Sequence, residues 1–336
     1  MASTSKRATQ PMTKKERVRA ALRGEAVDRV PVAMWGHDYL REWTREALVE
    51  ATLELYRAHD WDLIKLNPRW THFAEAWGST YEPPTEQRNP RTLTTTIHSA
   101  EDLAKLRPVH ARRGVFSDHL SALELMLAEV GDEVDVVATV FSPLSVVGLL
   151  CGLPDDLLPY AASDPASLHS AIAAVTVTLI DYAEACIAAG AAGIFYAPLV
   201  WASADTCDEA FYREYGRPYD LQVLARVRQA ELNILHVCRD HNMIDLLLDY
   251  PVAALNWADH GTGNPSLAEV KARTDKAVMG GIDQTRLAEM STGEAAAQAE
   301  AALSAGPERL FVTGGCSISP LTPDANRAAV VSAVRG

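Results

Sequence analysis

The chain has 336 residues, of which 31 are basic and 44 acidic, and its formal net charge is −13. An acidic chain without a basic stripe disfavours nucleic acid and anionic membranes as partners, which leaves small molecules and proteins. Residues 1–14 lack the apolar centre of a signal peptide, and no stretch approaches the roughly eighteen uninterrupted apolar residues of a membrane span. We therefore expect a cytoplasmic protein with a disordered N-terminal tail over residues 1–14.

Short apolar runs rich in β-branched and aromatic residues alternate with longer stretches of helical periodicity. The predicted strands are, in chain order, 29–36, 61–67, 135–142, 192–198, 232–238, 254–260, 277–283 and 310–316. The predicted helices are 38–59, 117–130, 165–189, 208–230, 241–248, 266–273, 293–305 and 323–335. Asp164-Pro165 and Thr322-Pro323 each place a capping side chain before a proline suited to a first helical turn.

This alternation predicts parallel strands joined by crossover helices, and eight strands are the number at which such a sheet closes. We expect an α/β fold, a (β/α)₈ TIM barrel that forms one domain over residues 15–336. Residues 68–134 exceed what a simple connection needs, so they are expected to carry an inserted lid or hairpin near the barrel mouth.

Metal-binding side chains follow two of the predicted strands. His236 and Cys238 end the fifth strand and are two residues apart, so both project to the same side, and Cys316 ends the eighth. In such barrels the carboxyl ends of the strands meet at one mouth, where one imidazole and two thiolates would suit Zn²⁺ and leave a fourth position open. The alternative, that these cysteines are small buried hydrophobes, stays open on residue type alone. The five cysteines show no disulfide-framework spacing, so we expect reduced thiols.

Other polar residues at the same strand ends are candidates for catalysis and substrate binding. Asp259 and Asp283 could orient ligands or supply a fourth metal contact, or they could simply cap the helices that follow them. His37, Asn67 and Tyr196 are candidates for holding the substrate because of their location.

Four blocks resemble the uroporphyrinogen decarboxylase superfamily from about Met12 to Gly336. They are TKKERVRAALRGEAVDRVPV, ILHVC, GGIDQ and the closing FVTGGCSISPLTPDANRAAVVSAVR. The resemblance implies a (β/α)₈ barrel. The decarboxylase branch carries an arginine-rich segment after the first strand, an aspartate near the end of the second and a histidine in the final block. This chain has Ala33-Met34-Trp35-Gly36-His37-Asp38, Lys65-Leu66-Asn67 and Cys316 at those places.

The other branch contains zinc-dependent methyltransferases that carry a methyl group from a methylated corrinoid protein to a thiol. Their ligand pattern, His-x-Cys and a distant Cys, matches His236, Cys238 and Cys316. The resemblance therefore implies an enzyme with Zn²⁺, methylcobalamin or another corrinoid as methyl carrier, a corrinoid-protein partner and a small-molecule thiol acceptor. Arg239 stands where relatives commonly have glycine, which would place a positive charge near an anionic acceptor. The alternatives are a decarboxylase or lyase for a smaller carboxylic acid, or a vestigial barrel that only accompanies a corrinoid protein.

Overall fold

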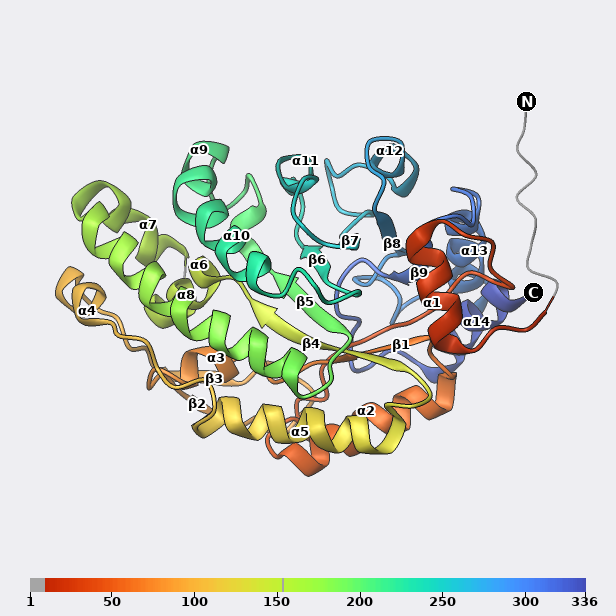
Figure 1. Cartoon of the computed structure of the whole chain (residues 1–336), viewed down its shortest axis with the longest axis horizontal. Coiled ribbons are helices and arrows are strands. Elements are labelled where there is room, and N and C mark those ends of the chain that lie inside the picture. Colours follow the sequence, from red (N-terminus) through yellow and green to blue (C-terminus); the bar gives the residue numbers. More distant parts are fainter. Residues whose placement is uncertain (1–9, 153) are drawn as a thin grey trace.

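A computed structural model describes residues 10–152 and 154–336 of the chain. Its main sheet has seven parallel strands in the order β1-β4-β5-β6-β7-β8-β9, curled with helices on its outer side (Figure 1). The strands are β1 (Leu63–Leu66), β4 (Asp135–Phe141), β5 (Gly193–Ala197), β6 (Ile234–Val237), β7 (Ala254–Trp257), β8 (Ala277–Ile282) and β9 (Leu310–Gly314). All of their residues are buried, as expected for parallel strands covered on both faces.

The segment 30–36 closes the ring between β9 and β1 without forming a regular strand. Val32 forms a parallel bridge with Val312 of β9, and its carbonyl accepts a hydrogen bond from the Asp62 amide, just before β1, at 2.9 Å. Pro31 has no N–H to donate, so a continuous ladder is interrupted here. The predicted strand 29–36 is thus reduced to isolated bridges, whereas the predicted barrel is confirmed as a TIM-barrel-like fold.

Each predicted helical stretch contains a helix, although several are shorter than expected. The helices are α2 (Arg45–His59), α5 (Gly114–Val130), α8 (Pro165–Ala188), α9 (Glu209–Phe211), α10 (Arg217–Arg226), α11 (Ile244–Leu247), α12 (Leu267–Lys271), α13 (Thr292–Leu303) and α14 (Asp324–Arg335). α2 begins late because the Thr44 side chain caps it by accepting a hydrogen bond from the Ala47 amide. A π-helical turn, Tyr212–Gly216, separates α9 from α10, where Pro218 cannot donate an N–H.

The two predicted proline-flanked caps have different outcomes. Asp164 caps α8, because its side chain accepts a hydrogen bond from the Ser167 amide at 3.2 Å. Thr322 does not cap α14: the N-cap is Pro323, and the buried Thr322 hydroxyl has no hydrogen-bond partner among the described residues. The prediction of a cap at Thr322 was therefore wrong.

The insertion over residues 68–134 contains the expected hairpin. It comprises α3 (His72–Glu75), the antiparallel strands β2 (Thr80–Glu82) and β3 (Arg91–Thr94), and α4 (Ala100–Lys105) before α5. Gln87, between the two strands, donates to the Asp38 carboxylate at 2.8 Å and accepts from the Tyr39 amide at 3.0 Å. These bonds tie the hairpin to the loop that follows residues 30–36. Two helices after β4, α6 (Pro143–Cys151) and α7 (Pro154–Ser163), were not predicted.

A further unpredicted helix, α1 (Lys14–Arg23), begins where the disordered tail was expected to end. Thr13 and Glu16 form a capping box, in which each side chain bonds the other's backbone amide. The tail prediction falls largely on residues 1–9, which lie outside the described residues. Its boundary at residue 14 is wrong, because Lys14 is already in the first turn of α1.

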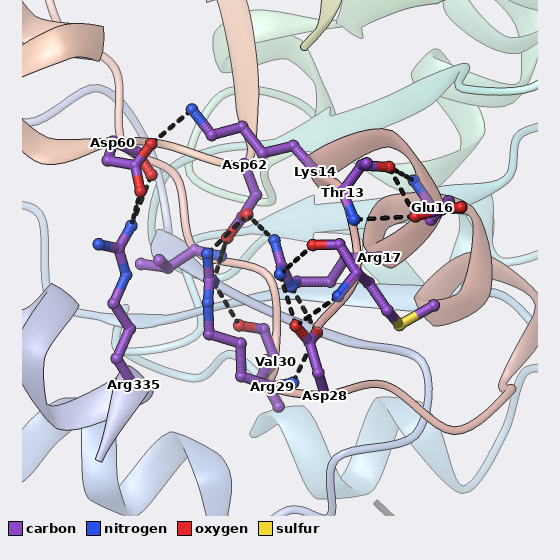
Figure 2. Close-up of polar contacts among 12 residues, drawn as sticks. Thr13, Lys14, Glu16, Arg17, Asp28, Arg29, Val30, Asp60, Asp62 and Arg335 are labelled. Carbon is purple, nitrogen blue, oxygen red and sulfur yellow. Dashed lines mark hydrogen bonds and ion pairs between the residues drawn. The ribbon is translucent and has the colours of Figure 1, made fainter. Parts of the chain in front are cut away.

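Figure 2 shows the buried ion-pair network that fastens α1 at the amino-terminal end of the strands. The fully buried Asp62 carboxylate accepts hydrogen bonds from Arg17 at 2.7 Å, from Arg29 at 2.9 Å and from the Val32 amide at 2.9 Å. Arg17 also forms two bonds to Asp28, at 2.7 and 2.6 Å. Because each buried charge is paired, the network holds α1 against the barrel floor, opposite the mouth.

α8 is the one helix in the described part of the chain that is long and apolar enough to cross a membrane. It has 24 residues and a mean hydropathy of 1.6 over its most apolar window, of which 56% is buried inside the fold. Its buried side chains include Ile172, Val175, Leu179 and Tyr182. A largely buried apolar helix is the usual composition of a core helix in a large barrel.

Candidate metal centre and active site

His236 projects from β6 with one ring nitrogen fixed by a neighbouring strand. Its Nδ1 lies 2.6 Å from Oδ1 of Asn256 on β7. The Asn256 amide nitrogen donates to the carbonyl oxygens of Met279 and Gly314, both at 3.0 Å, so its oxygen must accept. The imidazole therefore carries its proton on Nδ1 and presents the Nε2 lone pair, which is the arrangement that metal-binding histidines use.

The free Nε2 of His236 faces the predicted sulfur ligand from the end of β9. Cys316 Sγ lies 3.4 Å from His236 Nε2. In a tetrahedral zinc site with ordinary bond lengths, a nitrogen and a sulfur ligand stand about 3.5 Å apart. The approach depends on Gly315, where a Cβ would lie 2.8 Å from the Trp257 carbonyl and 2.9 Å from Ala258 Cα. The two predicted ligands are thus spaced as in a zinc site.

Cys238 completes the predicted triplet through its contact with Cys316. A hydrogen bond from the Cys238 thiol lowers the pKa of Cys316 well below the ordinary value. The same contact raises the pKa of Cys238. The two half-buried sulfurs therefore lie in hydrogen-bonding contact, and Cys316 is the thiol that loses its proton more readily.

Among the three predicted ligands, Cys316 contacts both His236 and Cys238, but the three do not form a complete coordination shell. Within residues 10–152 and 154–336, no group of three or more His, Cys, Asp or Glu side chains is arranged as a complete metal site. The donor set nevertheless fits zinc in its chemistry: an imidazole with a free Nε2, and two thiols, one of them with a lowered pKa. The metal assignment of His236, Cys238 and Cys316 accordingly stays a prediction.

A cavity of about 570 Å³ opens over the two cysteines. Its lining comprises Cys238, Arg239, Asp240, Ala258, His260, Gly261, Thr262, Asp283, Gln284, Thr285, Cys316 and Ser317. Arg239 is exposed at this cavity and has a left-handed backbone with φ 76°, which turns the chain sharply after Cys238. The prediction of a positive charge close to the sulfur ligands is consistent with this position.

The two predicted catalytic carboxylates are already engaged with backbone groups. Both oxygens of Asp259 accept from the Gly281 amide, at 3.1 and 3.0 Å, and burial raises the pKa of this carboxyl. Asp283 lines the cavity, but its Oδ1 accepts from the amide and the hydroxyl of Thr285 at 2.9 and 2.6 Å. The helices that follow these residues are capped by Ser266 and Ser291 instead, so the capping alternative is wrong for both. A catalytic role for either carboxylate stays a prediction.

His37 and Asn67, predicted to hold the substrate, lie in contact with each other. Asn67 Nδ2 donates to His37 Nε2 at 3.2 Å, and His37 Nδ1 lies 2.7 Å from the Glu42 carboxylate. His37 also stacks on Tyr39, with ring centroids 5.2 Å apart. The pair therefore belongs to one hydrogen-bonded chain on the β1 side of the mouth.

Tyr196 does not face the site, which corrects its predicted role. It is fully buried, and its hydroxyl donates to Asp220 of α10 at 2.7 Å. Successive side chains of a strand point to opposite faces, so Phe195 points inward in its place. The Phe195 ring stacks on His236 with centroids 5.1 Å apart and meets Trp35 edge-on at 5.1 Å.

Lys65 is the site residue that sequence reasoning left without a role. It is 7% exposed on β1, its Nζ donates to Asn67 Oδ1 at 2.6 Å, and it lies 4.5 Å from the centre of the Phe195 ring. Burial lowers the pKa of this amine to about 7. The available signal was the one charged residue of the strand segment LIKL, because a buried lysine is costly unless it has a function.

Fold and site together define a barrel protein whose mouth carries a histidine, two interacting cysteines and a buried lysine. The profile of the uroporphyrinogen decarboxylase (URO-D) family matches residues 13–336, so the chain belongs to this family, as its sequence blocks predicted. Curated relatives include the methylcobamide:CoM methyltransferase MtaA of Methanosarcina barkeri, 25% identical and aligned over 96% of this chain and 97% of that protein. The methylcobamide:CoM methyltransferase MtbA of Methanosarcina acetivorans is 21% identical and is aligned over 94% of this chain and 95% of that protein.

Solved structures agree on the fold. A methyltransferase from Methanosarcina mazei superposes with a TM-score of 0.80 at 24% identity and covers 96% of this chain and 98% of its own. A putative vitamin-B12 independent methionine synthase from Listeria monocytogenes gives a TM-score of 0.55 at 15% identity, and the match covers 87% of this chain and 85% of that structure. At these identities the two structures support the barrel and its topology.

Proposed function

We propose that this protein is a methyltransferase that moves a methyl group between a methylated corrinoid and a thiol, with zinc held by His236, Cys238 and Cys316. The observation that carries the proposal is the orientation of His236, whose Nδ1 is bound by Asn256 while Nε2 faces Cys316 at 3.4 Å. The curated relatives named methylcobamide:CoM methyltransferases support the same reaction class.

The roles of this chain's residues follow from their contacts. Asn256 keeps the His236 lone pair directed at the mouth, and the Trp35–Phe195 pair forms an apolar wall that excludes water from this side. Arg239 can attract an anionic group on the acceptor, because its side chain is exposed at the cavity that also contains Cys238 and Cys316. Zinc bound at this site would stabilise the thiolate of an incoming thiol near neutral pH.

The corrinoid would approach the barrel mouth, because both cysteines open there. We propose a corrinoid protein as the partner and expect the hairpin β2–β3 to lie at the edge of its docking surface. Its strands are largely exposed, and Gln87 ties it to the loop at residues 38–39. We also propose a cytoplasmic location.

Metal analysis tests the zinc site. The purified protein should contain close to one zinc per chain, and Cys316→Ser should lose most of it. Cys207→Ser is the matched control, because Cys207 is buried elsewhere and its thiol donates to the Trp201 carbonyl, a bond that a hydroxyl can keep. Absence of zinc from the wild-type protein prepared with added zinc would refute the site. Formation of a methylated thiol from methylcobalamin and coenzyme M then tests the reaction itself.

A further inference from the structure

Lys65 has a buried amine without a carboxylate partner in the described part of the chain. Its side chain is 7% exposed, and its one hydrogen bond there goes to Asn67 Oδ1 at 2.6 Å. A lysine amine has three hydrogens when charged, so two remain for another group. By contrast, the buried Arg17 and Arg327 both contact aspartates. A buried amine without a carboxylate partner does not stabilise the fold, so its presence at the barrel mouth needs another explanation.

A polarised chain of hydrogen bonds holds the amine in place. Lys65 donates to Asn67, Asn67 donates to Nε2 of His37 at 3.2 Å, and Nδ1 of His37 donates to Glu42 at 2.7 Å. Each donor and acceptor has one consistent assignment, because Asn67 uses its oxygen for the amine and its nitrogen for the imidazole. Glu42 is 2% exposed, so the chain ends on a buried carboxylate that balances a proton held at Lys65.

The amine lies beside the candidate metal centre. Its Nζ is 4.5 Å from the centre of the Phe195 ring, and the same ring stacks on His236. The charge of Cys316 also acts on Lys65 and favours its protonated form. Lys65 and His236 therefore contact the same ring, and Lys65 lies close enough to Cys316 for their charges to interact.

We propose that Lys65 is the catalytic base that takes the proton of the acceptor thiol. This inference rests on the proposed function. The S–H bond of the thiol breaks, its electron pair stays on sulfur, and an N–H bond forms on the neutral amine. The sulfur then bonds to the methyl carbon of the methylated corrinoid, while the carbon–cobalt bond breaks and its pair stays on cobalt. The positioning residues are Asn67, His37 and Glu42, which orient the amine and balance its charge when it is protonated.

The charged groups around Lys65 are compatible with a base near neutral pH. Burial lowers its pKa to about 7, although Cys316 opposes this shift. His119 interacts with it from α5, and burial lowers the pKa of that imidazole to about 3, so it is neutral. Through the hydrogen-bonded chain, His37 and Glu42 are the remaining titratable groups. A substantial share of Lys65 is therefore an unprotonated amine at pH 7.

The test compares kcat and KM of Lys65→Gln and the wild type between pH 6 and 9.5, with methylcobalamin as donor and coenzyme M as acceptor. We expect kcat of the variant to fall by about 10²-fold at pH 7. The deficit should shrink as the pH rises through the thiol's own pKa of about 8.5, where solution supplies the thiolate. Zinc content should not change. Lys105→Gln is the matched control, an exposed lysine of α4.

Lys65→Arg separates a base from a mere positive charge, because arginine keeps the charge but does not release a proton. Lys65→Arg should be as impaired as Lys65→Gln. If Lys65→Gln fails to fold, the activity of Lys65→Arg alone tests whether Lys65 is a base. Three results would each overturn the inference while leaving methyl transfer intact. They are wild-type activity of Lys65→Arg, a loss of kcat in Lys65→Gln that does not vary with pH, and an effect confined to KM. A wild type that contains zinc yet methylates no thiol would instead refute the proposed function.

Discussion

Asn256 and His236 form the contact on which the site's orientation depends: Oδ1 of the amide accepts the Nδ1 proton of the imidazole at 2.6 Å, on neighbouring strands β7 and β6. The asparagine is fully buried and donates in turn to backbone carbonyls of β8 and β9. One side chain thereby joins four strands and directs the histidine lone pair toward Cys316.

Replacing Asn256 should therefore weaken metal binding without removing a ligand. Asn256→Leu removes the acceptor for Nδ1–H, so the imidazole loses its fixed tautomer, and zinc affinity should fall by about 10- to 100-fold. Competition with a chromogenic chelator measures this affinity. Asn89→Leu, at an exposed position of the hairpin, is the control. An unchanged affinity in Asn256→Leu would mean that Asn256 does not orient a zinc ligand.

Arg239 should determine preference among acceptor thiols. Arg239→Gln removes a positive charge beside Cys238, so KM for the anionic coenzyme M should rise by about tenfold, corresponding to roughly 1.4 kcal/mol. KM for uncharged 2-mercaptoethanol should stay the same, which makes this thiol the internal control. Equal effects on both thiols would show that Arg239 acts on the backbone turn at its positive φ rather than on charge.

Tyr196 and Phe195 offer a paired test of which residue of β5 faces the mouth. Tyr196→Phe deletes one of three tyrosine hydroxyls that donate to the buried Asp220, so the free energy of unfolding should fall by about 1–3 kcal/mol while KM and kcat stay unchanged. Phe195→Leu removes the ring between Lys65 and His236 and should lower kcat. Urea denaturation and steady-state rates on both variants decide the question. A KM effect in Tyr196→Phe would restore its predicted role.

Asp28 should make the barrel floor sensitive to acid. Burial opposes its ionisation, but the bonds and charge of Arg17 outweigh burial and lower the pKa of Asp28 to about 2. Its pKa is lower in the folded state than in the unfolded chain. The stabilisation is therefore complete above pH 4 and is lost as the pH falls toward 2.

Asp28→Asn should accordingly cost about 2 kcal/mol at pH 7 and much less at pH 2.5, as measured by urea denaturation at both values. Asp275→Asn is the control, because the Asp275 carboxylate is fully exposed and its ion pair with Arg309 contributes little. A loss of stability that is equal at both pH values would contradict an electrostatic role for Asp28.

The sequence by itself determined the barrel and supplied the candidate ligands at its mouth. Alternating apolar runs and helical stretches specify strand and helix locally, and the two-residue spacing of His236 and Cys238 places both on one face whatever the rest of the chain does. The hairpin within 68–134 and the cap at Asp164 also follow from local sequence signals. Family membership followed from blocks of residues that can be read along the chain.

Only the tertiary structure decided which of the polar strand-end residues share a site. Whether Phe195 or Tyr196 faces inward depends on how β5 is rotated in the closed sheet, and a short, fully buried strand carries no polar alternation to reveal it. The hydrogen-bonded chain joins two separate segments, Lys65 and Asn67 at β1 and His37 and Glu42 before α2. It exists only because barrel closure brings residues 36–42 beside β1.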